Sequence, residues 1–416
     1  MTALLETLLE EGFATVAKAE QSTRRQVAFP ENKEMIKVAI GMRRSGKTTL
    51  LYQTIHTLLS QGVEYSQILL INFEDDRLLP MSAQEMGKLI DDFYQLYPEN
   101  HQRECYLFLD EVQNVPDWHV VVRRFFDSKN VQIYLTGSSA TLLSKEINTR
   151  LRGRSLAREV LPYDFREYLS AHQQTLPGKP FGKAAFDILH HHLLQYFATG
   201  GFPGVQHLPP DEWREVLQSY VDTVILKDIM ERHQIKNISL LRYLTLTLLK
   251  NAAARFSINK FHNDLKSQGY RVNKDTLHQY MTYIEDSFLI FRVSHYSASE
   301  RLKQTQPKKI YVIDYGLLNA ISLPLTKDQG RALENLVYLD LRRQGKTVYY
   351  YTSQQGYEID FVTVALDGTR ELIQVTWDMS DPQTAEREQR ALAAGQAELG
   401  LDGRIITVQD YLRAFL

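Results

Sequence analysis

The 416-residue chain has a single cysteine, Cys105, which excludes an internal disulfide bond. Such sparing use of cysteine is typical of a reducing compartment, so we expect a cytoplasmic protein. The sequence has no run of roughly eighteen apolar residues, and no membrane span is predicted. The N-terminus also lacks a basic region followed by an apolar segment and a small-residue cleavage site, and we therefore expect no export signal.

Neither sign of charge dominates the composition. The chain has 48 lysines and arginines against 50 aspartates and glutamates, a formal net charge of −2. This balance argues against a uniformly basic nucleic-acid-binding protein, although local basic faces stay open. Hydrophobic residues make up 44% and charged residues 24%, as in ordinary soluble proteins. A chain of 416 residues is long for one core, so we expect two or three domains.

A glycine-rich loop, GMRRSGKT (41–48), directly follows the apolar run 35–40. Glycines at both ends of such a loop let backbone N–H groups surround phosphate oxygens ahead of a helix N-terminus. We expect Lys47 to reach the β- and γ-phosphates and to act in catalysis, and the Thr48 hydroxyl to bind Mg²⁺. The predicted cofactors are ATP and Mg²⁺. The predicted nucleotide-binding residues are Gly41, Met42, Arg43, Arg44, Ser45, Gly46, Lys47, Thr48 and Thr49.

Two acidic residues end the apolar run 105–109. Five consecutive apolar residues indicate a strand that is buried on both faces, as in a parallel sheet. A hydrolase needs a carboxylate for Mg²⁺ and a group that polarises the attacking water. We assign Asp110, together with Thr48, to the metal and Glu111 to the water.

A third apolar strand is predicted at 131–135, and its end carries the hydroxyls of Thr136 and Ser138. These hydroxyls are candidates to sense the γ-phosphate. The segment RLRGR (150–154) then precedes another predicted strand, 156–161. A guanidinium here could neutralise transition-state charge from the same or a neighbouring subunit, and both Arg152 and Arg154 are candidates. A basic surface turn is the alternative.

The motifs fall into two groups along the chain. They are GMRRSGKTTLL (41–51), INFED (71–75), LDEVQ (109–113), LTGSS (135–139), Gly153-Arg154 and FREY (165–168), followed by GGFPG (200–204) and KIYVIDYG (309–316). Together they resemble the prokaryotic AAA+-like ATPases that carry a C-terminal domain of unknown function. The resemblance implies a Walker A, Walker B, sensor and arginine-finger arrangement, and a homo-oligomer such as a ring.

The expected fold class is α/β, with four parts. Residues 1–164 are predicted to form an AAA+-like P-loop core with a parallel sheet and an N-terminal helical extension. Residues 165–236 are predicted to form a helical lid or connector, interrupted at the glycines of GGFPG. A winged-helix-like domain (237–316) and a nuclease-like α/β domain (317–416) are expected to follow.

Residues 239–296 predict helix, helix, turn, helix and strand, the order of a winged helix-turn-helix. Four positions of the third helix are expected to face the core, namely Leu277, Tyr280, Met281 and Ile284. The predicted DNA-contact residues on its outer side are Lys274, His278, Gln279 and Thr282. Such folds also serve as protein spacers beside ATPase cores, and that alternative stays open.

The final part predicts the order αβββαβ, with its last strand at 405–408, and resembles the PD-(D/E)xK nuclease fold. Active members gather a divalent metal and a water with a helical Glu, a strand Asp and an acid-x-Lys pair. Glu334 and Asp360 stand at the first two positions, but Gln374 and Thr376 replace the acid and the lysine. An amide is a poorer Mg²⁺ ligand than a carboxylate, and threonine has no positive charge. We therefore predict an inactive hydrolytic site on a retained binding or docking fold.

Three functions are consistent with these features. The first is an oligomeric, Mg²⁺-dependent ATP-hydrolysing motor or switch that acts on DNA through the C-terminal domains. The second is a signal-transducing ATPase that binds protein partners and no DNA. The third is an ATP-regulated nuclease. We favour the first, with DNA as the expected partner and no membrane association.

Overall fold

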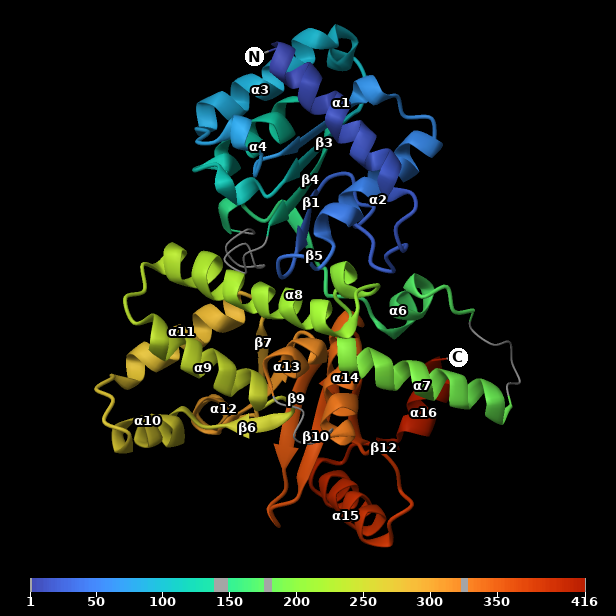
Figure 1. The fold of residues 1–416 in the computed structure, drawn as a ribbon, viewed down its shortest axis with the longest axis vertical. Helices are drawn as coiled ribbons and strands as arrows, with labels where there is room; N and C mark the ends of the chain where they lie inside the picture. The colour runs from blue at the N-terminus through green and yellow to red at the C-terminus, as the bar shows by residue number, and fades with distance from the viewer. Residues whose placement is uncertain (1, 138–148, 176–181, 323–327, 416) are drawn as a thin grey trace. The chain divides into compact units, whose positions relative to one another are not determined.

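The computed structural model describes residues 2–137, 149–175, 182–322 and 328–415 (Figure 1). The chain divides into two compact units, Met1–Tyr163 and Asp164–Leu416, called here the N-terminal and C-terminal units. Each unit has its own sheets and its own buried core, and each is described by itself.

The N-terminal unit is built on one five-stranded sheet. Its strands are β1 (Ile36–Ile40), β2 (Ile68–Asn72), β3 (Cys105–Asp110), β4 (Val131–Gly137) and β5 (Ser155–Glu159). The strand order is β2-β3-β4-β1-β5, and all neighbours are parallel. The predicted parallel sheet is therefore confirmed. Strand β5 ends at Glu159, before the predicted end at 161, and begins one residue before the predicted start at 156. The N–H of Val160 still donates to the Ile40 carbonyl, but the pairing with β1 ends there.

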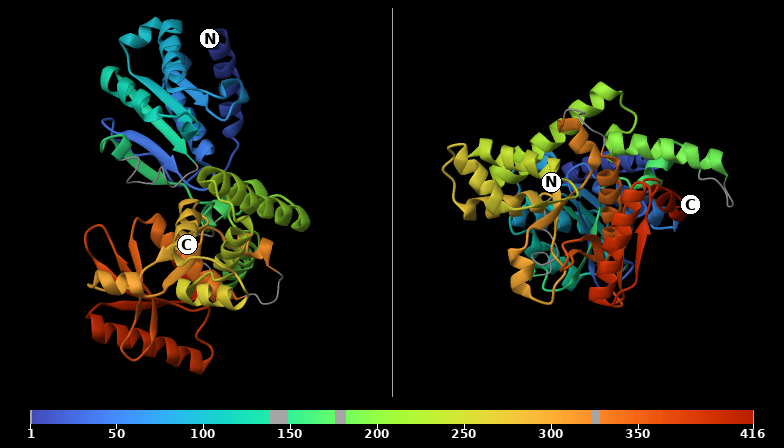
Figure 2. Two further views of the ribbon diagram at one scale, coloured as in Figure 1. Left: turned by 90° about the vertical axis from the view of Figure 1, so that its left-hand side faces the viewer. Right: turned by 90° about the horizontal axis from the view of Figure 1, so that it is seen from below.

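Helices cover both faces of this sheet. They are α1 (Thr2–Ala19), α2 (Lys47–Ser60), α3 (Ala83–Leu96) and α4 (Trp118–Ser128). Val16 of α1 and Ile55 of α2 pack with Leu70 and Phe108 in one apolar cluster on the sheet. In the left view of Figure 2, α1 (dark blue) and α4 (teal) lie on opposite sides of the strands. This layering buries β1, β3 and β4 on both faces and brings their carboxyl ends to one edge.

The C-terminal unit begins with helices. These are α6 (Phe165–Ala171), α7 (Lys183–Thr199), α8 (Pro210–Thr223) and the π-helical segment η7 (Val224–Glu231). The break after α7 is held by Asp314, whose carboxylate accepts the N–H of Gly201 at 2.5 Å and caps α13 (Tyr315–Ile321) through the N–H of Gly316 at 2.8 Å. Gly200 has φ 77°, and a Cβ there would stand 2.6 Å from Asp314 Cγ, so only glycine fits this turn.

The middle of this unit combines four helices with a small sheet. The elements are α9 (Ile238–Lys250), β6 (Ala254–Phe256), α10 (Ile258–Ser267), α11 (Lys274–Asp286), β7 (Ile290–Val293), α12 (Glu300–Thr305) and β8 (Lys308–Val312). The strand order is β6-β8-β7, and both pairs are antiparallel. The predicted inner face of α11 is buried at all four positions, Leu277, Tyr280, Met281 and Ile284.

The end of the unit carries a second sheet. Its elements are α14 (Gln329–Arg343), β9 (Thr347–Thr352), β10 (Glu358–Val364), β11 (Arg370–Val375), α15 (Pro382–Leu399), β12 (Gly403–Ile406) and α16 (Val408–Phe415). The order is β12-β11-β10-β9, with β11 and β12 parallel and the other pairs antiparallel. We expected the last strand to reach Val408. Instead Val408 begins α16, because Thr407 accepts the N–H of Asp410 and ends the strand.

No helix in the described part of the chain combines the length and the apolar character needed to cross a bilayer.

Candidate functional site

The loop between β1 and α2 has the backbone that a phosphate-binding loop needs. Gly41 has φ 156° and lies so close to the Val160 carbonyl that a Cβ would overlap it. Lys47 opens α2 and is buried, with Nζ donating to the carbonyl oxygens of Gly41 at 3.1 Å and Met42 at 3.0 Å. The ammonium group therefore lies over the loop itself.

Two features of this loop fit a bound phosphate chain. Ser45 Oγ is buried and has no hydrogen-bond partner among the described residues. A buried hydroxyl without a partner costs free energy, which a phosphate oxygen at this place would remove. The loop also precedes the N-terminus of α2, whose first N–H groups have no intrahelical acceptor.

The acidic residues after β3 lie beside the loop. Asp110 Oδ2 accepts the Thr48 hydroxyl at 2.8 Å, so the two predicted metal ligands are in contact. Thr136, at the end of β4, donates its hydroxyl to Asp110 Oδ1. The same hydroxyl oxygen accepts the backbone N–H of Glu111 at 2.9 Å. One buried threonine thus joins both acidic residues, and its contact with the γ-phosphate stays a prediction.

Glu111 has a constrained position. Its φ of 50° is left-handed, which is unusual for a residue with a side chain. Its Oε1 lies 3.7 Å from Lys47 Nζ. Burial, and then the charge of Glu111, raises the pKa of Asp110 to about 6. A divalent cation favours the charged form of a carboxylate, and the oxygens of Thr48 and Asp110 are the donor type that Mg²⁺ prefers.

Arg25 braces the loop and was not identified from the sequence. Its guanidinium is buried and donates to the carbonyls of Ser45 and Leu161, each at 2.7 Å, and it lies 5.3 Å from the Tyr163 ring centroid. It stands in a polar stretch, QSTRRQV (21–27), where nothing distinguishes it from a surface arginine. Only the fold shows that it joins the loop to the end of the N-terminal unit.

The two arginine-finger candidates, Arg152 and Arg154, both lie on the surface. Arg152 is exposed and has φ 54°. Arg154 is also exposed and forms an ion pair with Asp127 of α4. A surface arginine can leave such a pair at little cost, so both candidates keep their predicted role as hypotheses. Ser138 lies outside the described residues.

The predicted contact positions on α11 are all on its outer side. Lys274, His278, Gln279 and Thr282 are exposed. Two of them use their donors within the helix, because Gln279 Nε2 donates to Tyr283 Oη at 2.6 Å and the Thr282 hydroxyl donates to the His278 carbonyl at 3.1 Å. The first half of α11 is therefore the better placed for contact with a partner.

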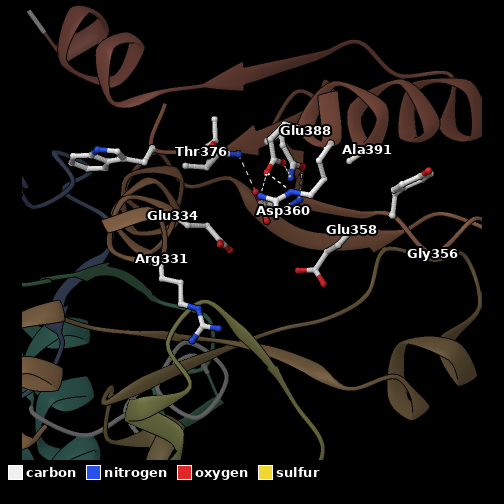
Figure 3. Close-up of a pocket in the computed structure, with 14 residues that line it drawn as sticks. Arg331, Glu334, Gly356, Glu358, Asp360, Thr376, Glu388 and Ala391 are labelled. Carbon is white, nitrogen blue, oxygen red and sulfur yellow. Dashed lines mark hydrogen bonds and ion pairs between the residues drawn. The ribbon is translucent and has the colours of Figure 1, made fainter. Parts of the chain in front are cut away.

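The predicted nuclease-like residues meet around a cavity of about 480 Å³ (Figure 3). Glu334 comes from α14, and Glu358 and Asp360 come from β10. Gln374 Oε1 accepts the N–H of Asp360 at 3.2 Å, whereas the Thr376 hydroxyl turns to the Asp378 carbonyl at 3.3 Å. Burial and the charge of Asp360 raise the pKa of Glu334 above its ordinary value.

Two further carboxylates line this cavity and were not identified from the sequence. Glu358 alternates with Asp360 on β10 and therefore faces the same way. Glu388 of α15 accepts Gln374 Nε2 at 2.6 Å. Glu358 could have been identified from the sequence, because it stands two positions before Asp360 in a predicted strand. Nothing in the sequence near Glu388 indicates its place in the cavity.

A parallel sheet of this order, with the phosphate-binding loop after β1, defines the AAA+-like class of P-loop ATPases. A family model described as "AAA domain" matches residues 33–169. Two further models, described only as domains of unknown function (DUF8612 and DUF4143), match residues 190–329 and 329–408.

Within that class the chain belongs to the family of an uncharacterized protein of Methanocaldococcus jannaschii. The two are 35% identical over 402 residues, which cover 95% of this chain and 87% of the relative. An uncharacterized protein of Haemophilus influenzae is 29% identical over 337 residues, 80% of each chain.

Solved structures give weaker likenesses. A Walker-type ATPase of Pyrococcus abyssi has a TM-score of 0.44 and 13% identity, covering 72% of this chain and 97% of that one. The ORC2 protein of Aeropyrum pernix, in ADPNP–ADP complexes, has a TM-score of 0.39 and 13% identity, covering 82% and 94%. The fold class rests on the strand order and the AAA match instead.

Proposed function

We propose that this protein is a Mg²⁺-dependent ATPase that acts on DNA as an oligomeric motor or switch. The observation that carries the ATPase part is the hydrogen-bonded chain from Thr48 through Asp110 and Thr136 to Glu111, directly beside the phosphate-binding loop. It brings metal ligands and a carboxylate for water activation to one edge of a rigid sheet.

Each residue then has a definite task. Lys47 and the loop N–H groups would bind the β- and γ-phosphates, and Thr48 and Asp110 would hold Mg²⁺. The bound metal would supply positive charge where negative charge develops during phosphoryl transfer. Glu111 would orient and polarise the attacking water, held in place through its backbone N–H by Thr136. Arg152 or Arg154 would approach the γ-phosphate of a neighbouring subunit.

Charge supports the DNA part. Residues 232–274 contain nine lysines and arginines and a single acidic residue, Asp264, whereas the whole chain is slightly negative. Lys260, Lys266, Arg271 and Lys274 of this segment are exposed on and between α10 and α11. Such a local basic face is the electrostatic signature of nucleic-acid binding, which is largely set by phosphate contacts.

The element order around α11 supports a winged-helix reading of this segment. The helices α9, α10 and α11 and the antiparallel sheet β6-β8-β7 follow the order that winged helices use, with the short helix α12 added between β7 and β8, and α11 follows the turn at Gly269. His233 stacks on Tyr283 of α11 with ring centroids 3.6 Å apart, and so occupies the surface of the helix at that residue. We therefore infer that Arg271, Lys274 and His278 contact DNA first.

Steady-state ATP hydrolysis tests both parts. We would measure turnover by the full chain without nucleic acid and with single-stranded, duplex and branched DNA, and use Glu111→Gln as the blank. The blank is expected to bind ATP and to lose turnover, since the loop and Asp110 remain. Wild-type turnover in Glu111→Gln would remove Glu111 from its role.

A charge-matched pair of variants separates DNA contact from general electrostatics. Arg271→Glu with Lys274→Glu should weaken DNA binding and lower the slope of log affinity against log salt by roughly 2, about one per lost phosphate contact. Lys183→Glu with Arg390→Glu makes the same change in net charge at exposed positions elsewhere in the C-terminal unit and should leave the slope unchanged. Stimulation by no form of DNA would instead favour the switch that binds protein partners.

A further inference from the structure

The acidic cavity of the second sheet would hold a divalent metal in an active nuclease of the fold that it resembles. The carboxylates are present, since Glu334, Glu358 and Asp360 face a common space (Figure 3). Whether they fit a metal depends on what else lies within reach of their oxygens.

A lysine from another sheet lies among these three carboxylates. Lys309 of β8 is only 2% exposed, and its Nζ lies 2.6 Å from Glu334 Oε1, 2.8 Å from Glu358 Oε1 and 2.9 Å from Asp360 Oδ1. An ammonium group has three donors, and each meets one carboxylate. The distances are those of charge-assisted hydrogen bonds, and the positive charge stands where the three acids converge.

Further donors of the chain reach oxygens of the cluster. Asp360 Oδ2 accepts the N–H of Val375 at 2.9 Å, and Tyr311 Oη donates to Glu334 Oε1 at 2.7 Å. The amide of Gln374 bridges the Asp360 N–H and Glu388. Glu388 in turn accepts Arg387 Nη2 at 2.6 Å. The donor set therefore does not fit a divalent cation, because an ammonium group stands where the three acids converge and one oxygen of each acid is already bound to it.

We propose that Lys309 takes the place of the divalent cation and makes this cavity a metal-free joint between the two sheets of the C-terminal unit. The proposal rests on the geometry of the cluster and is independent of ATP hydrolysis or DNA binding. The proposal also argues against the nuclease alternative. A buried ammonium group cannot activate a water molecule and bind the attacking and leaving oxygens as a catalytic metal ion does.

Other contacts cross the same boundary between the two sheets. The Asn335 side chain of α14 accepts the N–H of Val312 and donates to its carbonyl, both at 2.9 Å. Arg255 of β6 pairs with Glu358 of β10 at 2.9 Å. Tyr350 Oη donates to the Pro307 carbonyl at 2.5 Å. Lys309 is therefore one of several polar contacts that join the sheet β6-β8-β7 to the second sheet and to α14, and it meets three acidic side chains at once.

Thermal melting and Mn²⁺ titration of the nucleotide-free full chain test this assignment. Lys309→Met removes the ammonium and keeps much of the apolar stem, which leaves three buried carboxylates without their cation. We expect its melting midpoint in EDTA to fall by about 10 °C relative to wild type, since breaking one side of a buried ion pair is strongly destabilising. Mn²⁺ should restore most of that loss, and Asp360→Asn in the same variant should abolish the restoration.

The neighbouring lysine supplies the matched control. Lys308 lies on the same strand, but its Nζ donates to Ser294 Oγ at 3.2 Å and to the Lys303 carbonyl, outside the cluster. Lys308→Met should therefore show no restoration by Mn²⁺ beyond that of wild type.

A second measurement does not depend on the folding of Lys309→Met. Asp360→Asn in the otherwise wild-type chain should leave the number of bound Mn²⁺ ions unchanged, because the lysine already fills the site. A Mn²⁺ ion bound by wild type and lost in Asp360→Asn would overturn the proposal. DNA cleavage that requires both Mn²⁺ and Asp360 would overturn it equally.

Discussion

Replacing Thr136 by valine tests whether its hydroxyl holds the two acidic residues of the nucleotide site. The side chain is fully buried, and valine has nearly the same shape. The change therefore removes one hydroxyl without opening a cavity. It leaves the Glu111 N–H without its acceptor at 2.9 Å and one oxygen of Asp110 without its donor.

The expected cost follows from these two lost hydrogen bonds. Each buried group without a partner costs about 1–3 kcal/mol, so the two lost hydrogen bonds of Thr136→Val should destabilise the N-terminal unit by roughly 2–6 kcal/mol. Turnover should suffer separately. The left-handed backbone of Glu111 costs about 1–3 kcal/mol and persists only while its surroundings hold it. A catalytic group that moves by about 1 Å loses on the order of 100-fold in rate.

Three measurements separate these effects. Melting of the full chain reports stability, a fluorescent ATP analogue reports affinity, and steady-state phosphate release reports turnover. We expect lower stability, little change in affinity and a fall in kcat of on the order of 100-fold. Thr136→Ser keeps the hydroxyl and should retain most of the activity. Equal losses in the serine and valine variants would show that the methyl group matters instead, and wild-type turnover in Thr136→Val would refute the reasoning.

Three further predictions concern the loop and the turn after α7. Lys47→Ala should lower both ATP affinity and turnover, as judged by titration and phosphate release, because the charge acts in the ground and transition states alike; unchanged affinity would mean that the loop binds differently. Gly200→Ala should destabilise the C-terminal unit by about 3–5 kcal/mol in denaturant melts, from backbone strain and a displaced Asp314 carboxylate. Gly345→Ala, with a similar φ of 73° and no atom within 4 Å of the added Cβ, should cost only the strain, about 1 kcal/mol. Burial raises the pKa of Asp314 from 3.8 to about 6, so its folded form binds a proton between those values and its contribution to stability falls as the pH rises through them. The stability lost in Asp314→Asn should therefore shrink by up to about 3 kcal/mol from pH 4 to pH 7, and a constant difference would contradict the shift.

The P-loop core could be predicted because its signals are local, whereas the roles of its residues stay predictions. The loop 41–48 needs glycines at fixed positions, and the run 105–109 has no polar residue that would allow an exposed strand. The structure brings Thr48 and Asp110 into contact as the class requires. The link through Thr136 was not predictable from the sequence. A hydroxyl at a strand end can face either the γ-phosphate or the neighbouring strand, and the sequence does not show which.

Arg25 and Glu388 show what the sequence hides. Each meets its partners across long separations, Arg25 with Leu161 and Glu388 with Gln374. Such contacts depend on the completed fold, and neither residue stands in a periodic or glycine-marked segment. The predicted end of β12 was wrong for a different reason. Thr407 suits both the end of a strand and the cap of a helix, and here it caps α16.

The two motifs of the C-terminal unit meet in the structure, and this changes what they mean. Gly200 and Gly201 receive the carboxylate of Asp314, and five residues earlier on the same segment Lys309 enters the acidic cavity. From the sequence alone, two motifs such as GGFPG and KIYVIDYG could be interpreted as parts of one catalytic site. Here both ends of KIYVIDYG make buried contacts that hold other elements in place, Asp314 to the break after α7 and Lys309 to α14 and β10. These contacts therefore give Asp314 and Lys309 a role in the assembly of the C-terminal unit. Variants at Lys309 should therefore alter the stability of the C-terminal unit and leave the proposed ATP turnover without DNA unchanged.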